Sequence, residues 1–328
     1  MEDIKQVRKD VHSVLALFAV CKALLVLTQR FLGPALYRGL HRVFGDAASQ
    51  IFSEFSTYAT PAGLILEIGI SVFCLFVPVC FYFFITGKKY TRIVPSQQPE
   101  FLQICFGVGS TVIVGNVASI AGNIILLSLF SFFGMEDTYN AMLESETAYP
   151  SNIWLVPLFV LIFAILPAFL EEILMRGIGV SATKRLGTLF TLFFSGFFFA
   201  FMHGTWIQIP FAFAVGLVLT YFTLRFNTIW IAVISHFIFN FNSVVQCLIL
   251  QNGGEFADLC VIIWSALFST LMIGLMVAGL IIYGVKRPNL PKSDLRMAQK
   301  MKILFSSPFL YVFILLEVYQ LIYLLTIY

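Results

Sequence analysis

Long runs of apolar residues, separated by short polar connections, dominate the chain. A helix needs about 20 apolar residues to cross the hydrocarbon core of a bilayer. Runs close to this length predict nine candidate spans, at residues 11–33, 62–86, 101–133, 152–176 (which can extend to 185), 187–204, 208–226, 228–250, 258–285 and 303–328. Because two of these runs are short, the pattern predicts an all-α, polytopic transmembrane bundle of eight or nine spans.

The segment 33–60 departs from this pattern. It mixes Arg38, His41, Arg42 and Glu54 with Leu, Val and Phe. Such a mixture favours an amphipathic helix that lies in the membrane interface. No soluble domain of any size stands out, so residues 1–328 are expected to form a single transmembrane domain.

The composition supports a membrane protein. Hydrophobic residues make up 59% of the chain and charged residues only 11%, whereas a soluble domain has about 25% charged residues. The net charge of +3 is too small to predict a nucleic-acid partner. The lipid bilayer is therefore the first partner that the sequence predicts.

The basic residues are distributed unevenly between the two sides of the predicted bundle. Fifteen of the twenty lie in the N-terminal segment and in every second connection, whereas the opposite side has Arg38, Arg42 and an acidic loop around residues 136–146. Cytoplasmic loops carry the excess of Lys and Arg. The N-terminus is thus expected to be cytoplasmic.

Ionisable residues inside membrane spans are costly and indicate functional positions. Lys22 and Glu317 lie midway along the first and the last spans, where they can pair, or Lys22 can extend to the interface. The remaining candidates are concentrated in one stretch of the chain: Glu171, Glu172, Arg176, His203, His236 and Asn240.

Helix geometry predicts how the two glutamates differ. Glu172 and Arg176 are four residues apart and can form an ion pair on one helix face. Glu171 points about 100° away from that face. Pro167 removes a backbone hydrogen bond and is expected to kink the span just before them.

The same geometry predicts that distant residues meet. If the helix continues to Arg185 and turns near Gly187, Glu171 and His203 each lie about 21–22 Å from that turn. His236 lies about 13 Å beyond the next cytoplasmic turn, and Asn240 follows one turn later on the same face. One carboxylate, two imidazoles and one carboxamide can therefore converge in the cytoplasmic half of the membrane.

Several kinds of chemistry fit this set. A carboxylate and an imidazole can hold and deprotonate a water molecule, and a second imidazole with an amide can stabilise an oxyanion. Two His and one Glu can also bind Zn²⁺, although the sequence lacks an HExxH helix. From geometry alone, a structural polar network and a transport path remain open as well.

Three motifs then resemble a known family. Residues 171–176 read EExxxR, residues 199–203 read FxxxH and residues 236–240 read HxxxN. In this order and spacing they resemble the CPBP family of intramembrane proteases, which includes type II CAAX prenyl endopeptidases and bacteriocin-processing or self-immunity proteins. The resemblance covers a motif-bearing core at about 152–251. Met175 departs from the family pattern, which often has an aromatic residue before the Arg.

The resemblance implies an intramembrane endopeptidase that cleaves a membrane-associated protein or peptide, in a bacterial plasma membrane, with its site toward the cytoplasmic leaflet. Glu171 and His203 would activate water, His236 and Asn240 would stabilise the oxyanion, and Glu172 and Arg176 would support the site. A glutamate-type mechanism without a cofactor is favoured, and zinc is the less favoured variant. The alternatives are a non-catalytic immunity or scaffold protein on the same fold and, less favoured, a transporter.

Overall fold

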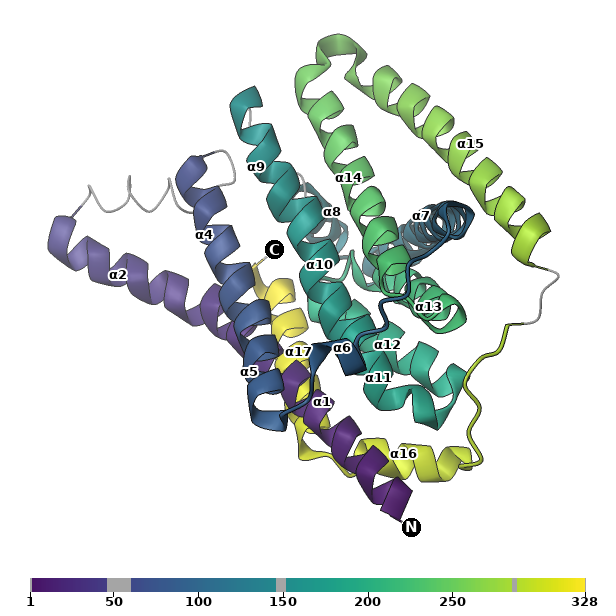
Figure 1. Cartoon of the computed structure of the whole chain (residues 1–328). Helices are drawn as coiled ribbons and strands as arrows, with labels where there is room; N and C mark the ends of the chain where they lie inside the picture. The colour runs from purple at the N-terminus through teal and green to yellow at the C-terminus, as the bar shows by residue number, and fades with distance from the viewer. Residues whose placement is uncertain (1, 46–59, 146–151, 285–287, 328) are drawn as a thin grey trace.

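The computed structural model describes residues 2–45, 60–145, 152–284 and 288–327, and helices make up nearly all of them (Figure 1). Within these ranges β-type pairing is limited to one isolated bridge between Ser96 and Thr228. The prediction of an all-α fold is confirmed. The helices are α1 (Glu2–Leu27), α2 (Gly33–Phe44), α4 (Pro61–Ser71), α5 (Val77–Thr86), α6 (Tyr90–Ile93), α7 (Phe101–Phe132), α8 (Glu136–Ser145), α9 (Val156–Val160), α10 (Leu166–Glu172), α11 (Val180–Thr183), α12 (Thr188–His203), α13 (Ile209–Phe226), α14 (Trp230–Asn252), α15 (Ala257–Tyr283), α16 (Met297–Phe305) and α17 (Pro308–Ile327).

In the described part of the chain, eight helical stretches are long and apolar enough to cross a membrane. They are Ile4–Phe44, Pro61–Thr86, Phe101–Phe132, Val156–Leu186, Ile209–Phe226, Trp230–Asn252, Gly254–Tyr283 and Pro308–Ile327. The shorter apolar helix Thr188–His203 occupies the remaining predicted span. The chain is an integral membrane protein with the predicted eight or nine spans, and its cytoplasmic N-terminus stays a prediction.

The N-terminal helix is longer than the apolar run predicts. We expected the first span to end near residue 33, but helical structure continues to Phe44 through a π-helical turn at Thr28–Leu32. Pro34 cannot donate to the preceding turn, and the wider π-helical turn accommodates this break without ending the helix. Most side chains of α2 are exposed, and α2 extends away from the bundle in Figure 1. Its interfacial role stays a prediction, and residues 46–59 lie outside the described ranges.

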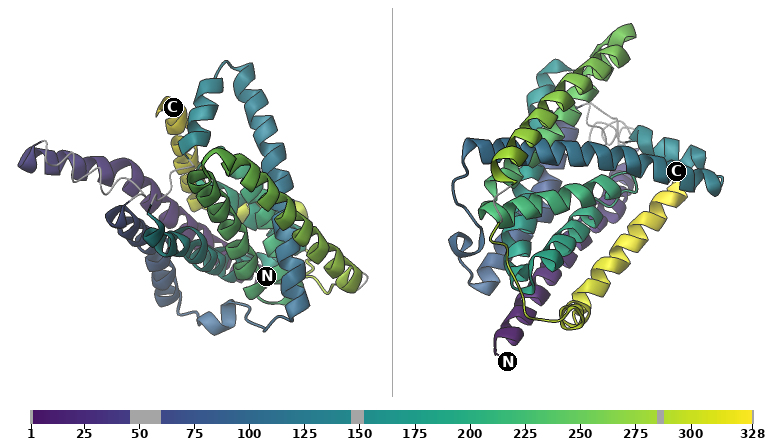
Figure 2. Two further views of the ribbon diagram at one scale, coloured as in Figure 1. Left: turned by 90° about the horizontal axis from the view of Figure 1, so that it is seen from above. Right: turned by 90° about the vertical axis from the view of Figure 1, so that its right-hand side faces the viewer.

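The helices α12 and α13 pack closely at the centre of the molecule. A Cβ atom on Gly216 of α13 would lie 2.9 Å from the Cα of Gly196 on α12, so only glycine permits this approach. Small residues at helix contacts allow such close packing in membrane proteins. The helices α7 and α14 pack against α13 and against each other, and α1 packs along α17 (Figure 2).

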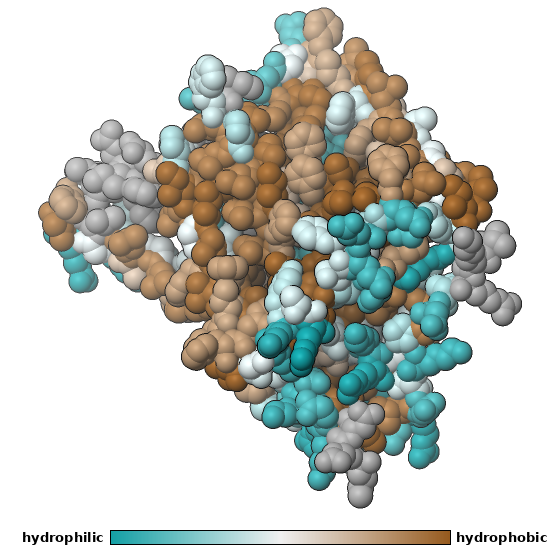
Figure 3. Space-filling view, in the orientation of Figure 1, coloured by the Kyte–Doolittle hydropathy of each residue, from teal (hydrophilic) through white to brown (hydrophobic). Residues whose placement is uncertain are grey.

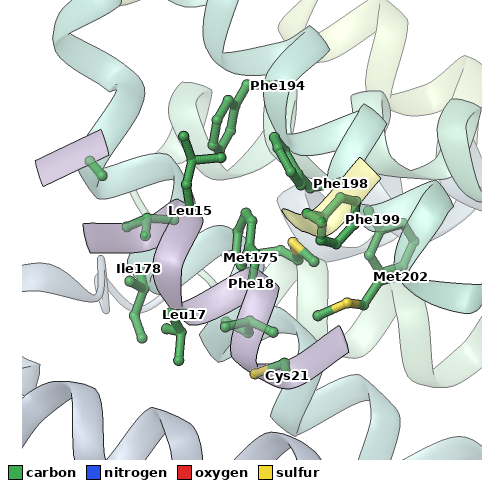
Figure 4. Close-up of a cluster of buried hydrophobic side chains, with 14 of the residues drawn as sticks. Leu15, Leu17, Phe18, Cys21, Met175, Ile178, Phe194, Phe198, Phe199 and Met202 are labelled. Carbon is green, nitrogen blue, oxygen red and sulfur yellow. The ribbon is translucent and has the colours of Figure 1, made fainter. Parts of the chain in front are cut away.

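One buried apolar cluster connects the N-terminal helix to the centre of the bundle. Figure 4 shows Phe18 of α1 among Phe194, Phe198 and Phe199 of α12, with Met175 nearby. The ring centroids of Phe18 and Phe198 are 5.0 Å apart. The first helix thus packs directly on the helix that ends at His203.

Polar residues gather at one end of the molecule. Figure 3 shows an apolar surface over most of the visible face and hydrophilic residues at the end that holds the N-terminus and α16. A cavity of about 240 Å³ at this end brings together Lys88, Arg92, Lys184 and Arg185 from two different connections. The basic connections that the sequence assigned to one side therefore meet in space.

Candidate active site

The helix that carries the two glutamates is broken twice by π-helical turns. The first turn, Leu161–Ile165, comes just before Pro167, which cannot donate a hydrogen bond to the preceding turn. The second, Ile173–Gly179, follows Glu172 directly. Insertions of this kind often mark functional sites. As expected, the helix continues past Arg176 to Leu186, and the chain turns at Gly187, where φ is +88°.

Glu172, Arg176 and His236 form a sealed ionic group. The predicted ion pair is present, with Arg176 Nη1 2.9 Å from Glu172 Oε1. His236 Nδ1 lies 2.9 Å from the same oxygen, so the ring donates to the carboxylate from α14. The side chains of Glu172 and Arg176 are fully buried, and that of His236 nearly so.

Arg176 also connects this group to α13. Its Nη2 donates to the carbonyl oxygen of Gly216 at 3.2 Å. The sequence predicted the ion pair from residue spacing, but it gave no sign that His236 would bind Glu172. That contact joins residues of two helices that are 64 positions apart in the chain. It fixes the ring of His236 through Nδ1 and leaves Nε2 available for another partner.

Glu171 and His203 form the open half of the site. His203 Nε2 lies 3.9 Å from Glu171 Oε2, and about a fifth of each side chain is exposed (19% and 20%). His203 Nδ1 is 2.7 Å from the carbonyl oxygen of Phe199. Because a carbonyl only accepts, Nδ1 carries the proton, and in the neutral ring Nε2 presents a lone pair toward Glu171.

The separation of these two atoms is too long for a direct hydrogen bond. It is short enough for one water molecule to donate a hydrogen bond to each of them. The arrangement can therefore hold a water molecule between a carboxylate and an imidazole, with the oxygen lone pairs of the water pointing elsewhere.

The ring of Phe199 lies between the two halves. Its centroid is 4.9 Å from that of His203 and 5.5 Å from that of His236, and both contacts are edge-to-face. The guanidinium of Arg176 lies over the same ring, 4.3 Å from its centroid. In the sequence, Phe199 is only the first residue of the FxxxH motif. Its spacing of four residues from His203 was the available signal for a contact.

Asn240 is the least engaged of the candidates. It lies one turn beyond His236 on α14 and is half-buried. Within the described ranges its carboxamide makes no hydrogen bond to protein, so its donors are free for another molecule. The structure thus brings together Glu171, His203 and His236, with Asn240 on the adjoining turn.

The donor set does not suit a metal ion. In the described part of the chain, no three His, Cys, Asp or Glu side chains come together as a set of metal ligands. A catalytic zinc site needs three protein ligands. Here His236 Nδ1 and Glu172 Oε1 bind each other, and His203 Nδ1 binds a carbonyl. Independence of the reaction from metal stays a prediction.

Comparison with known proteins identifies the segment that carries the motifs. Residues 153–242 match the family model described as type II CAAX prenyl endopeptidase Rce1-like. No curated protein and no solved structure matches the chain. The matched segment contains all six candidate residues, and it supports a CAAX-type intramembrane protease that acts on a membrane-associated substrate. The resemblance predicted from the three motifs is thereby confirmed, because residues 153–242 match the Rce1-like family model.

Proposed function

We propose that the protein is an intramembrane endopeptidase that hydrolyses a peptide bond of a membrane-associated protein or peptide with a water molecule activated by Glu171 and His203. The observation that carries this proposal is the gap of 3.9 Å between His203 Nε2 and Glu171 Oε2. Glu171 Oε2 and His203 Nε2 are two proton acceptors at a separation that one water molecule can bridge. Such an arrangement can place a general base within hydrogen-bond reach of the water proton, which general base catalysis requires.

The reaction uses the two acceptors in turn. The water oxygen attacks the carbonyl carbon of the scissile bond while one proton of the water passes to Glu171 or His203. A tetrahedral intermediate with a negatively charged oxygen results. The same proton then moves to the leaving nitrogen as the C–N bond breaks, which frees the amine. The second proton of the water leaves the new carboxyl group for the other acceptor, which gives a carboxylate.

The buried group of Glu172, Arg176 and His236 supports the proposed oxyanion site. His236 Nδ1 donates to Glu172, so a protonated ring has its second N–H, on Nε2, available for the oxyanion. The free carboxamide of Asn240 supplies a second donor. Glu172 interacts with both Arg176 and His236, so it holds the imidazole in place without being part of the water site.

The sidedness of the site forms part of the proposal. Glu171 lies on the helix that ends at Lys184 and Arg185, which line the basic cavities at the hydrophilic end of the molecule. Basic connections face the cytoplasm. The proposed site therefore opens toward the cytoplasmic leaflet, and a membrane-anchored tail or peptide in that leaflet is the proposed substrate.

Replacement of Glu171 by Gln tests the proposal. We expect Glu171→Gln to lower the rate of cleavage about 10²–10⁴-fold, the range that general-base catalysis contributes. The assay uses purified protein in liposomes with a farnesylated CAAX peptide, alongside the same peptide without the prenyl group. Labelling of new termini in membrane fractions from wild-type and Glu171→Gln cells extends the comparison to native substrates.

Glu67→Gln is the matched control, because Glu67 is a half-buried glutamate in α4 and lies outside the three motifs. It should cleave like the wild type. If Glu171→Gln keeps its fold and cleaves at the wild-type rate, the proposed mechanism is wrong. If cells with the variant show the same membrane-protein termini and the same phenotype as the wild type, a non-catalytic immunity or scaffold role replaces it.

A further inference from the structure

Lys22 is a charged residue buried near the C-terminal end of α1. Its side chain is fully buried, and its ammonium forms an ion pair with Glu317 of α17, which is also buried. The sequence allows either pairing or extension to the interface, and the structure shows pairing. The ammonium has a second partner, because Lys22 Nζ donates to the carbonyl oxygen of Phe201 at 3.1 Å.

Phe201 lies in the last turn of α12, two residues before His203. The last four carbonyl groups of a helix have no partner within the helix. A cation near this end also interacts favourably with the helix dipole. Lys22 therefore binds the helix end that carries His203.

The C-terminal helix holds the next residues of the same turn. Gly204 ends α12 with φ at +67°, and the side chain of Gln320 fills the space where a Cβ atom would be, at 2.4 Å. Trp206 Nε1 donates to the carbonyl oxygen of Leu321 at 3.2 Å. Together, α1 and α17 contact the turn from Phe201 to Trp206 at three successive places.

We propose that Lys22, oriented by Glu317, is a positioning residue that holds the last turn of α12 and thereby sets the distance from His203 to Glu171. This inference rests on the proposed function, which requires that distance. Both residues of the pair lie outside the segment 153–242 that matches the family model. The flanking helices thus contribute to the site from outside the matched segment.

The geometry of the site explains why holding the last turn of α12 in place would affect the rate of cleavage. His203 and Glu171 are on separate helices, and one water molecule fits between them at 3.9 Å. A displacement of about 1 Å in an active site can cost about 100-fold in rate. A buried ion pair is a weak source of stability, because desolvation offsets the attraction. A gain in stability therefore does not explain the pair of Lys22 and Glu317. A positioning role does, because Lys22 also binds the C-terminal end of α12.

Two variants distinguish a positioning role of Lys22 from a purely structural one. Lys22→Met with Glu317→Leu removes both charges and the donor to Phe201, and it leaves no unpaired charge behind. Glu317→Gln keeps Lys22, which can still donate to Phe201 and to the new amide. We expect the double variant to lower kcat about 10- to 100-fold with little change in KM. Glu317→Gln should lose stability, because the charge of Lys22 is then uncompensated, but it should retain most of the wild-type kcat per folded molecule.

A structural role predicts a different result. In that case kcat per folded molecule stays at the wild-type value in both variants, and only the amount of folded protein falls. That outcome would overturn the proposal. The assay uses the farnesylated CAAX peptide in liposomes, with the folded fraction measured in the same preparations.

Hydrogen exchange provides a readout that does not depend on cleavage. In the double variant the amides of residues 201–206 should exchange faster than in the wild type, whereas those of α14 around Ser235 should not change. Unchanged protection of residues 201–206 would overturn the proposal. If exchange rises as expected while the wild-type protein cleaves nothing, the link between Lys22 and this turn stands and the proposed function fails.

Discussion

Replacement of Glu172 by Gln should destabilise the protein more than any other single isosteric change in the site. The variant keeps the shape of the side chain but removes the negative charge that faces Arg176 and His236, both at 2.9 Å. Arg176 would remain as an uncompensated charge in a fully buried position. Breaking a buried pair in this way costs about 3–5 kcal/mol.

The structure places the expected value at the lower end of that range. Arg176 keeps two other partners, the carbonyl oxygen of Gly216 and the ring of Phe199. We therefore expect a loss of about 3 kcal/mol in the free energy of unfolding. Arg176→Met should cost less, because a protonated His236 can compensate for the charge left on Glu172.

A double-mutant cycle in mixed detergent micelles measures the effect. Unfolding by SDS is followed by circular dichroism for Glu172→Gln, Arg176→Met and the double variant. We expect the double variant to be about 2 kcal/mol more stable than the sum of the single losses predicts, since it leaves no isolated charge. Additive losses, or a Glu172→Gln variant as stable as the wild type, would refute this reasoning.

The ion pair between Lys88 and Asp10 is a control of similar length but higher exposure. Its atoms are 2.7 Å apart, and the side chains are 30% and 20% exposed. Asp10→Asn should cost about 0–1 kcal/mol, the usual range for a pair near solvent.

The protonation of Lys88 makes this control valid at neutral pH. Burial lowers the pKa of Lys88, but hydrogen bonds to Asp10 and Tyr82 outweigh it, so the pKa lies above its ordinary value. The stabilisation is then fully present below the ordinary pKa of lysine. It is lost only as the pH rises through the raised value.

Three further outcomes are expected. Cleavage should continue in EDTA, with less than one metal ion per purified molecule by mass spectrometry; activity that is lost in chelator and restored by zinc would contradict the glutamate mechanism. Gly216→Val should cost about 1–3 kcal/mol by forcing α12 and α13 apart, whereas Gly274→Ala, where a Cβ meets no atom within 4 Å, should be tolerated. In a variant without native cysteines, a membrane-impermeant maleimide added from the cytoplasmic side should label a cysteine at Lys89 and not one at Glu136; the reverse would show the opposite topology.

The sequence predicted the features that depend on local spacing. Apolar run length located the spans to within a few residues for most helices, because hydrocarbon thickness fixes helix length. The pair of Glu172 and Arg176 followed from their i,i+4 spacing. The approach of His203 to Glu171 followed from counting residues on each side of the turn at Gly187.

Features that depend on helix rotation and register could not be predicted in this way. The bond from His236 to Glu172 requires the orientation of α14 about its axis, which residue counting does not provide. The π-helical turn Ile173–Gly179 rotates the residues that follow it about the axis of their own helix. No distinctive composition marks this turn in the sequence. The contact of Lys22 with a backbone carbonyl of α12 leaves no side-chain signal at Phe201.

The position of Phe199 has a consequence for sequence variation among related proteins. One ring contacts two imidazoles and a guanidinium, so a change at this position alters three polar groups at once. Positions 176, 199, 203 and 236 should therefore evolve as a set, in which a replacement at one is accepted only with matched replacements at the others. In homologues that have lost activity, this constraint should relax at all four positions together.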